Sequence, residues 1–178
     1  MSQKAQRQEV DVAETPVPPR PAQTSPHVRN ALNGPLGDAG IEFIATAIKE
    51  STTSKLQALY MYGNGGLAGT PADDPGKQLA RNRALRRNFA TAYTDTGHDR
   101  RAEPGGTFAH NNFHKLVDYG FRAVHLTVTS AKRIAHSFFT QAPNHSYWDG
   151  CSTGGRQAMI SAQRFPDDFD GIVAGAPA

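Results

Sequence analysis

The chain has 178 residues, a length that one domain can account for. Its 19 basic and 16 acidic residues give a formal net charge of +3. They are scattered, without the basic stripe and interleaved aromatic residues typical of nucleic-acid binding, so we expect no nucleic-acid partner. No apolar run approaches the ~20 residues of a membrane span, so we expect no membrane insertion. Residues 1–30 contain no apolar stretch of signal-peptide length, so the sequence itself assigns no compartment.

Residues 1–40 have the composition of a disordered, proline-rich leader. Prolines at positions 16, 18, 19, 21 and 26 lie among Gln, Ser, Thr and charged residues. Such a segment buries too little apolar surface to offset the conformational entropy lost on ordering. The next segment, residues 41–49 (IEFIATAIK), is apolar and fits either a strand or a helix. We place the start of the folded domain at residue 41 and let that domain run to residue 178.

From residue 56 onward, short apolar runs alternate with amphipathic stretches. The predicted strands are residues 56–62, 89–94, 146–148 and 172–174, and the predicted helices are residues 76–87, 121–139 and 154–165. Strands that alternate with helices predict an α/β fold, with a mostly parallel sheet flanked by helices. Because the sequence stops soon after the fourth strand, we expect the sheet to be incomplete.

The run Gly150-Cys151-Ser152-Thr153-Gly154 joins a predicted strand to a predicted helix. A G-x-S-x-G run in this position is typical of the nucleophile elbow of α/β-hydrolases, in which a sharp turn lifts the serine hydroxyl above the sheet edge. Small residues are needed on both sides of the serine, and Gly150 and Gly154 provide them. The sequence therefore predicts Ser152 as the nucleophile of a serine hydrolase.

An oxyanion site needs two backbone N–H donors near the nucleophile. The amide of Thr153, at the start of the helix, is one candidate. The second donor usually comes from a glycine-rich loop after an earlier strand, and Gly65 and Gly66 of the run Gly63-Asn64-Gly65-Gly66 lie in such a place. The same run also fits a plain loop or a weak phosphate-binding loop, although the Gly-Lys-Ser/Thr and G-x-G-x-x-G patterns of nucleotide sites are missing.

The histidines are placed unusually for such an enzyme. All of them precede Ser152 in the sequence, at positions 27, 98, 110, 114, 125, 136 and 145, whereas α/β-hydrolases take their triad in the order Ser, acid, His. We therefore expect this chain to lack the base and the acid of the triad. His98 ends a strand at the same sheet edge as Ser152 and is a candidate pocket residue. A structural hydrogen bond is the alternative for His98, and the same two interpretations apply to Asp95.

Cys151 is the single cysteine, so an internal disulfide is excluded. A lone cysteine is most often a small buried apolar residue. As a nucleophile it would need a nearby histidine, which makes Ser152 the better candidate. Asp149, in the strand before the elbow, is expected to orient the turn.

The residues from 146 to 178 closely resemble the tannase and feruloyl esterase family, which includes mono(2-hydroxyethyl) terephthalate hydrolase. The similarity is carried by SYWDGCSTGGRQ (146–157), AQRFP (162–166), DFDGI (168–172) and AGAPA (174–178). The loop GNGGLAG (63–69) is similar to the oxyanion loop of the family, and TDTGH (94–98) and YGFRAVH (119–125) match further blocks. The resemblance covers about residues 56–178.

This resemblance implies a carboxylic ester hydrolase that acts on small aromatic acyl esters such as galloyl or feruloyl esters. It implies that Ser152 is the nucleophile and that Cys151 would form a disulfide with a cysteine just after the catalytic histidine. That cysteine, the histidine, the acid and the inserted lid domain, which often binds a structural calcium, are all missing here. We therefore interpret the chain as the N-terminal part of an α/β-hydrolase fold, nearly inactive alone.

No metal ligand set and no cofactor are expected within the chain itself. The family resemblance implies a secreted or periplasmic protein, although the chain shows no signal peptide. The alternative function is a non-catalytic remnant or binding module that keeps the hydrolase scaffold. The sequence does not specify the acyl group, the alcohol or the oligomeric state.

Overall fold

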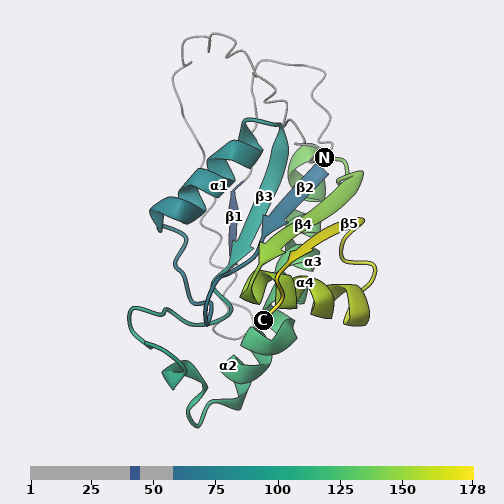
Figure 1. Cartoon of the computed structure of the whole chain (residues 1–178). Coiled ribbons are helices and arrows are strands. Elements are labelled where there is room, and N and C mark those ends of the chain that lie inside the picture. Colours follow the sequence, from purple (N-terminus) through teal and green to yellow (C-terminus); the bar gives the residue numbers. More distant parts are fainter. Residues whose placement is uncertain (1–40, 45–57) are drawn as a thin grey trace, which may run out of the picture.

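A five-stranded sheet forms the centre of the protein. The computed structural model describes residues 41–44 and 58–178, and its strands are β1 (Ile41–Ile44), β2 (Ala58–Tyr62), β3 (Phe89–Thr94), β4 (His145–Cys151) and β5 (Gly171–Gly175). Their order across the sheet is β1-β3-β2-β4-β5 (Figure 1). β1 pairs antiparallel with β3, and the other neighbours are parallel, which confirms the predicted mostly parallel α/β sheet.

The helical elements connect these strands. They are α1 (Pro75–Leu85), the 3₁₀ turn η1 (Thr107–Ala109), α2 (Phe113–Val117), the π-helical turn η2 (Asp118–Arg122), α3 (Ala123–Phe139) and α4 (Thr153–Arg164). The carboxylate of Asp74 accepts hydrogen bonds from the amides of Gly76 and Lys77, and Pro75 occupies the first helical position, so α1 begins where a cap and a proline favour it.

Most predicted elements are confirmed, with shifts of one to three residues at their ends. The strand at 89–94 has the predicted bounds, and the strand predicted at 146–148 extends over 145–151. The segment left open between strand and helix is a strand over 41–44, and its remaining residues lie outside the described part of the chain. The predicted disordered leader, residues 1–40, lies outside it as well.

The core lies between the sheet and the helices α3 and α4. Leu59, Met61 and Trp148 project from the strands and are at most 1% exposed, and they pack against small side chains of the two helices. The helical contribution comes from residues at helical spacing: Val124, Val128, Ala131 and Ala135 of α3 and Ala158 of α4. Figure 1 shows α1 in front of the sheet and α3 behind it, so helices cover both faces.

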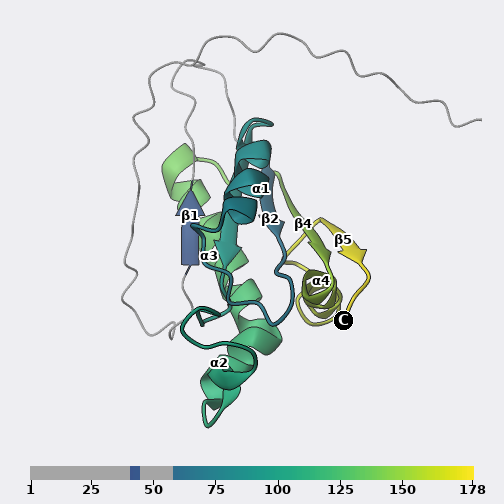
Figure 2. The ribbon, with the colours of Figure 1, turned by 60° about the vertical axis from the view of Figure 1, so that its left-hand side comes forward.

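One region differs from the expected pattern. The helix predicted over 121–139 is preceded by α2 and the π-helical turn, which sequence periodicity did not indicate. These two short elements extend below the strands (Figure 2). Arg122 donates to the buried carboxylate of Asp118 at 2.6 Å, and the guanidinium of Arg156 lies over the Tyr119 ring and donates to the carbonyl of Gly120. Charged contacts from α4 thus support a turn that contains a glycine.

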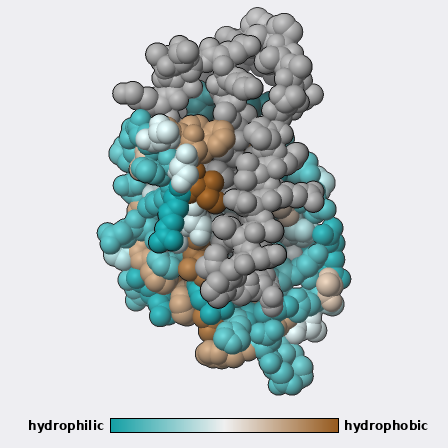
Figure 3. Space-filling view, turned by 180° about the vertical axis from the view of Figure 1, so that it is seen from behind, coloured by the Kyte–Doolittle hydropathy of each residue, from teal (hydrophilic) through white to brown (hydrophobic). Residues whose placement is uncertain are grey.

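The surface is mixed in character. Where residues are described, the face seen in Figure 3 combines hydrophilic residues with smaller hydrophobic areas. Within the described residues, none of the helices has the length and apolarity required to span a bilayer.

The parallel strands bring the candidate site together. β2, β3 and β4 run in the same direction, and Tyr62 pairs with Asp149 in register. The carboxyl ends of these three strands therefore meet at one edge of the sheet. The run Gly63-Asn64-Gly65-Gly66, called the glycine loop below, follows β2 at this edge, and Ser152 follows β4.

Candidate active site

Ser152 occupies a strained backbone bend between β4 and α4. Its φ is 59° and its ψ is −123°, a backbone conformation that residues other than glycine rarely adopt. The bend is tied on both sides, since the Ser152 amide donates to the Gly175 carbonyl at 3.0 Å and the Ser152 carbonyl accepts from the amides of Arg156 and Ala178. The Ser152 side chain is half-buried and makes no hydrogen bond to the backbone amides at the start of α4, so its hydroxyl does not cap the helix.

Three glycines allow the chain to pass around this bend. A β carbon on Gly63 would lie 2.5 Å from the Cα of Gly154 and 3.2 Å from that of Gly150. A β carbon on Gly150 would collide with the backbone of Gly154. The expectation that Gly150 and Gly154 must be small therefore agrees with the packing, and Gly63 belongs to the same contact.

The glycine loop lies directly against the start of α4. The Thr153 hydroxyl donates to the Gly66 carbonyl, and the Gly154 amide donates to the Asn64 carbonyl at 2.8 Å. Within the described residues, the amides of Thr153, Gly65 and Gly66 donate to no acceptor. The structure thus places the Gly65-Gly66 loop against Thr153, and the three N–H groups that the sequence assigned to an oxyanion site have no acceptor among the described residues.

Asn64 is buried at the centre of these contacts. Its side-chain Nδ2 donates to the Thr94 carbonyl at 3.1 Å, and its Oδ1 accepts from the Tyr93 hydroxyl at 2.6 Å. Its backbone amide donates to Oε1 of Gln157 at 3.2 Å. One residue of the loop is therefore bonded to both β3 and α4.

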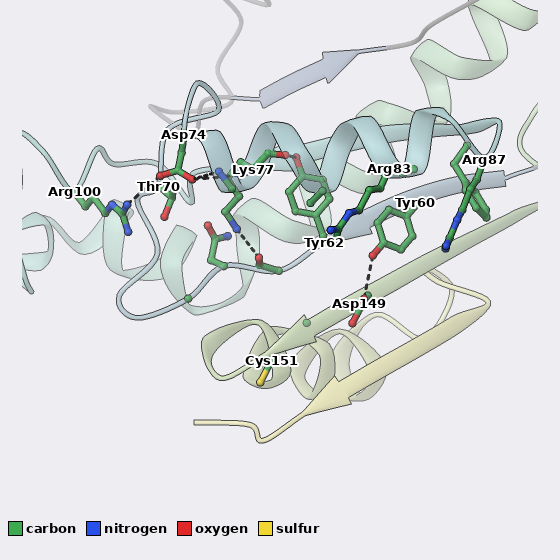
Figure 4. A pocket seen from close by; sticks show the side chains of 18 residues that line it. Tyr60, Tyr62, Thr70, Asp74, Lys77, Arg83, Arg87, Arg100, Asp149 and Cys151 are labelled. Carbon is green, nitrogen blue, oxygen red and sulfur yellow. Dashed lines mark hydrogen bonds and ion pairs between the residues drawn. The ribbon is translucent and has the colours of Figure 1, made fainter. Parts of the chain in front are cut away.

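Lys77 approaches the same loop from α1. Its Nζ donates to the Gly63 carbonyl at 2.8 Å (Figure 4), and it lies 4.8 Å from the centre of the Tyr93 ring. Burial lowers the pKa of Lys77 to about 8, and the positive charge of Arg100 adds to this effect, while Asp74 opposes it.

A cavity of about 840 Å³ lies between α1 and the face of β2 and β4. Lys77 and Arg83 of α1, and Arg87 just after that helix, line one side of it, and the Tyr60 hydroxyl donates to Asp149 at 3.1 Å on the opposite wall (Figure 4). Gly150 and Cys151 line this cavity, whereas Ser152 does not. The cavity is thus adjacent to the elbow and is not centred on its serine.

His98 lies away from this cavity. It is 4% exposed, its Nε2 is 3.0 Å from the Leu67 carbonyl, and its ring stacks on Phe108 at 3.8 Å between centroids. Burial lowers the pKa of His98 and favours the neutral ring. It does not line the cavity, and its contacts match the structural alternative. Asp95 likewise accepts from the amide of Gly97 and orders the turn.

Cys151 differs from the expectation for a lone cysteine, because it is exposed and carries a free thiol. The disulfide implied by the family resemblance is not formed within this chain, which has no second cysteine. Asp149 is exposed, and its carbonyl accepts from the Gly63 amide at 2.8 Å, so its backbone helps to hold the loop at the elbow. Within the described residues no cluster of three or more His, Cys, Asp or Glu side chains could hold a metal ion.

A mostly parallel sheet with a strained serine between a strand and a helix defines the α/β-hydrolase class. The model of the family "Tannase and feruloyl esterase" matches residues 49–178, and the chain belongs to this family of ester hydrolases.

The chain is 47% identical over 95 residues to an uncharacterized esterase of Xanthomonas campestris, an alignment that covers 53% of this chain and 16% of that protein. It is 42% identical over 118 residues to feruloyl esterase B of Aspergillus niger, covering 65% of this chain and 21% of the relative. The crystal structure of feruloyl esterase B from Aspergillus oryzae superposes with a TM-score of 0.63 at 37% identity, covering 79% of this chain and 25% of that one. The chain thus spans about a fifth of the length of these curated relatives.

Sequence reasoning missed three residues that hold the loop: Asn64, Lys77 and Gln157. Asn64 was included in the glycine run only as a turn residue, and Gln157 only as part of a family block. Their partners lie between 14 and 93 positions away in the chain, so no local pattern could indicate these hydrogen bonds.

Proposed function

We propose that this protein is a carboxylic ester hydrolase in which Ser152 is the nucleophile. One observation carries the proposal: Ser152 stands on a strained bend, its hydroxyl makes no capping hydrogen bond to α4, and the Gly65-Gly66 loop is hydrogen-bonded to the next residue, Thr153. Strain of this kind is retained where the surrounding structure enforces it, commonly at catalytic positions.

The chemistry is a two-step acyl transfer. A base removes the proton of the Ser152 hydroxyl as Oγ attacks the ester carbonyl, and the carbonyl oxygen takes the negative charge. The amides of Thr153 and of the Gly65-Gly66 loop donate to this oxyanion. The C–O bond then breaks, the alcohol leaves with the proton, and water attacks the acyl-enzyme to release the acid and restore Ser152.

Within the described residues, no histidine is hydrogen-bonded to the Ser152 hydroxyl, and His98 and His125 are engaged with Leu67 and Asp168. Loss of the base of a Ser-His-Asp triad slows turnover by about 10⁴–10⁶-fold. We therefore expect the 178-residue chain alone to hydrolyse esters at a very low rate.

The substrate class follows from the relatives. Feruloyl esterase B of Aspergillus niger and the feruloyl esterase B of known structure are named for aromatic acyl esters. We propose small aromatic esters of the feruloyl or galloyl type as substrates.

Active-site labelling tests the nucleophile. The purified chain is incubated with an aryl phosphonate at high concentration, and the modified peptide is located by mass spectrometry. We expect the label at Ser152 in the wild-type chain and in Ser161→Ala, a serine variant of the same helix, and no label at that peptide in Ser152→Ala. Equal modification of several serines would contradict the assignment. An absence of label together with tight ester binding would favour the non-catalytic binding module instead.

A further inference from the structure

We propose that Asn64, held by Gln157, is the positioning residue that fixes the distance between the two halves of the oxyanion site. One half is the Gly65-Gly66 segment after β2, and the other is the Thr153 amide at the start of α4. This inference rests on the proposed function, because it assigns residues that act through the oxyanion amides.

The backbone of Asn64 is bonded to α4 at both of its polar groups. Its amide donates to Oε1 of Gln157 at 3.2 Å, and its carbonyl accepts from the Gly154 amide at 2.8 Å. The residue before Gly65 is therefore attached to the residue after Thr153. A shift of the loop relative to the elbow has to break one of these two hydrogen bonds.

The side chain of Asn64 provides the third and fourth attachments. Nδ2 donates to the Thr94 carbonyl at the end of β3, and Oδ1 accepts from the Tyr93 hydroxyl, which is also 2.7 Å from the Thr70 carbonyl. Asn64 is 2% exposed, so water does not replace these partners. An asparagine satisfies both sites because its amide presents one donor and one acceptor. An aspartate in the same place would turn an acceptor toward the Thr94 carbonyl, and a leucine would remove both hydrogen bonds, leaving the Tyr93 hydroxyl with the Thr70 carbonyl alone.

The side chain of Gln157 provides a second observation in favour of this positioning role. Its Nε2 is buried and is the one buried side-chain polar atom without a hydrogen-bond partner among the described residues. Rotating the amide by 180° would direct this NH₂ group at the Asn64 amide, donor against donor, so the observed orientation is the one that serves Asn64. An unpaired buried donor is unfavourable, and it accompanies an arrangement that keeps Oε1 on the loop.

Asn64 and Gln157 are positioning residues, since neither is hydrogen-bonded to Ser152. Removing an oxyanion donor outright lowers acyl-transfer rates by about 10²–10³-fold. Displacing the loop while its amides remain present is a smaller change, and we expect about a 10–10²-fold loss.

The test compares four variants with the wild-type chain through the rate at which an aryl phosphonate modifies Ser152, measured well below the melting temperature of every variant. Asn64→Leu removes both side-chain partners, and Gln157→Met removes the acceptor for the Asn64 amide. Gln157→Glu retains that acceptor. Val128→Ala, on the core-facing side of α3, is expected to be less stable without touching the loop.

We expect Asn64→Leu and Gln157→Met to be modified about 10–10²-fold more slowly, Gln157→Glu to recover most of the rate, and Val128→Ala to match the wild type. Wild-type rates in folded Asn64→Leu and Gln157→Met would overturn the positioning proposal while leaving Ser152 as the nucleophile. A wild-type chain that is not modified at Ser152 would instead overturn the proposed function. Where a variant does not fold, amide hydrogen exchange at Gly154 in the folded ones decides: faster exchange in Gln157→Met supports the proposal, and unchanged exchange contradicts it.

Discussion

Gly63, at the end of β2, and Gly154, in the first turn of α4, approach so closely that a β carbon on Gly63 would lie 2.5 Å from the Gly154 Cα. Two segments separated by most of the folded chain thus touch backbone to backbone, next to the elbow.

We expect Gly63→Ala to destabilise the fold by about 1–3 kcal/mol, because the added methyl group has to push α4 away from β2. Gly65→Ala is the matched control, since a β carbon there would meet no atom within 4 Å. Urea unfolding of both variants measures the difference. Equal midpoints for the two alanine variants would show that the contact is more compliant than its geometry indicates.

The strain at Ser152 gives a second prediction. Both Ser152→Gly and Ser152→Ala remove the hydroxyl, but glycine adopts a φ of 59° without a steric penalty. We expect the glycine variant to be more stable than the alanine variant by about 1 kcal/mol. Ser161, inside α4, should show the reverse order, because alanine is preferred to glycine in a helix by about 1 kcal/mol. Thermal unfolding of the four variants tests this reversal, and the same order at both positions would argue against strain at residue 152.

Lys77 predicts a pH dependence of stability. Its pKa is about 8 in the folded protein against 10.5 for a free lysine side chain, so the unfolded chain binds more protons between these values. Stability should therefore rise with pH from about 8 to 10.5, as the burial penalty on the charged amine disappears in the folded state.

The comparison for this effect is with Lys77→Arg, whose guanidinium stays charged throughout that range. We expect the wild type to gain stability relative to Lys77→Arg as the pH rises above 8. Chemical unfolding at several pH values measures the difference, and a constant offset between the two proteins would refute the assignment.

A hydrogen bond between His125 and Asp168 connects α3 to the segment before β5. His125 Nδ1 lies 2.9 Å from Oδ2 of Asp168, whose side chain is 7% exposed, and burial raises the pKa of this carboxyl group. His125→Ala leaves the buried carboxylate without its partner, so we expect a loss of about 1–3 kcal/mol at neutral pH. His136→Ala, at an exposed position of the same helix, should change stability little. Comparable losses in both variants would mean that the pair contributes nothing specific.

The sequence was most informative where structure is determined locally. The apolar run from Phe89 to Thr94 and the glycine-flanked turn at Ser152 both carry their signals within a few residues, and the structure has a strand and a bend there. The family resemblance, carried by residues 146–178, is confirmed by the family match over residues 49–178.

The remaining features depend on contacts between distant segments. The long helix was predicted to begin at residue 121, whereas a π-helical turn occupies Asp118–Arg122, and Arg156 of α4 donates to the Gly120 carbonyl within that turn. Side chains alternate between the two faces of β4, and Cys151 lies on the opposite face from the buried Trp148, which explains its exposure. The presence of a single cysteine in the sequence did not indicate which face it would occupy. The roles assigned to Ser152, Thr153, Gly65 and Gly66 stay predictions until the labelling experiment is done.

Both peptide groups of the Ser152 bend are used by residues at the far end of the described chain: its amide by the Gly175 carbonyl and its carbonyl by the Ala178 amide. A slip of β5 by one position would turn the wrong groups toward the bend and release it. The backbone conformation at residue 152 therefore depends on the register of the last strand. Substitutions in residues 171–178 should change the position of the Ser152 hydroxyl without contacting it.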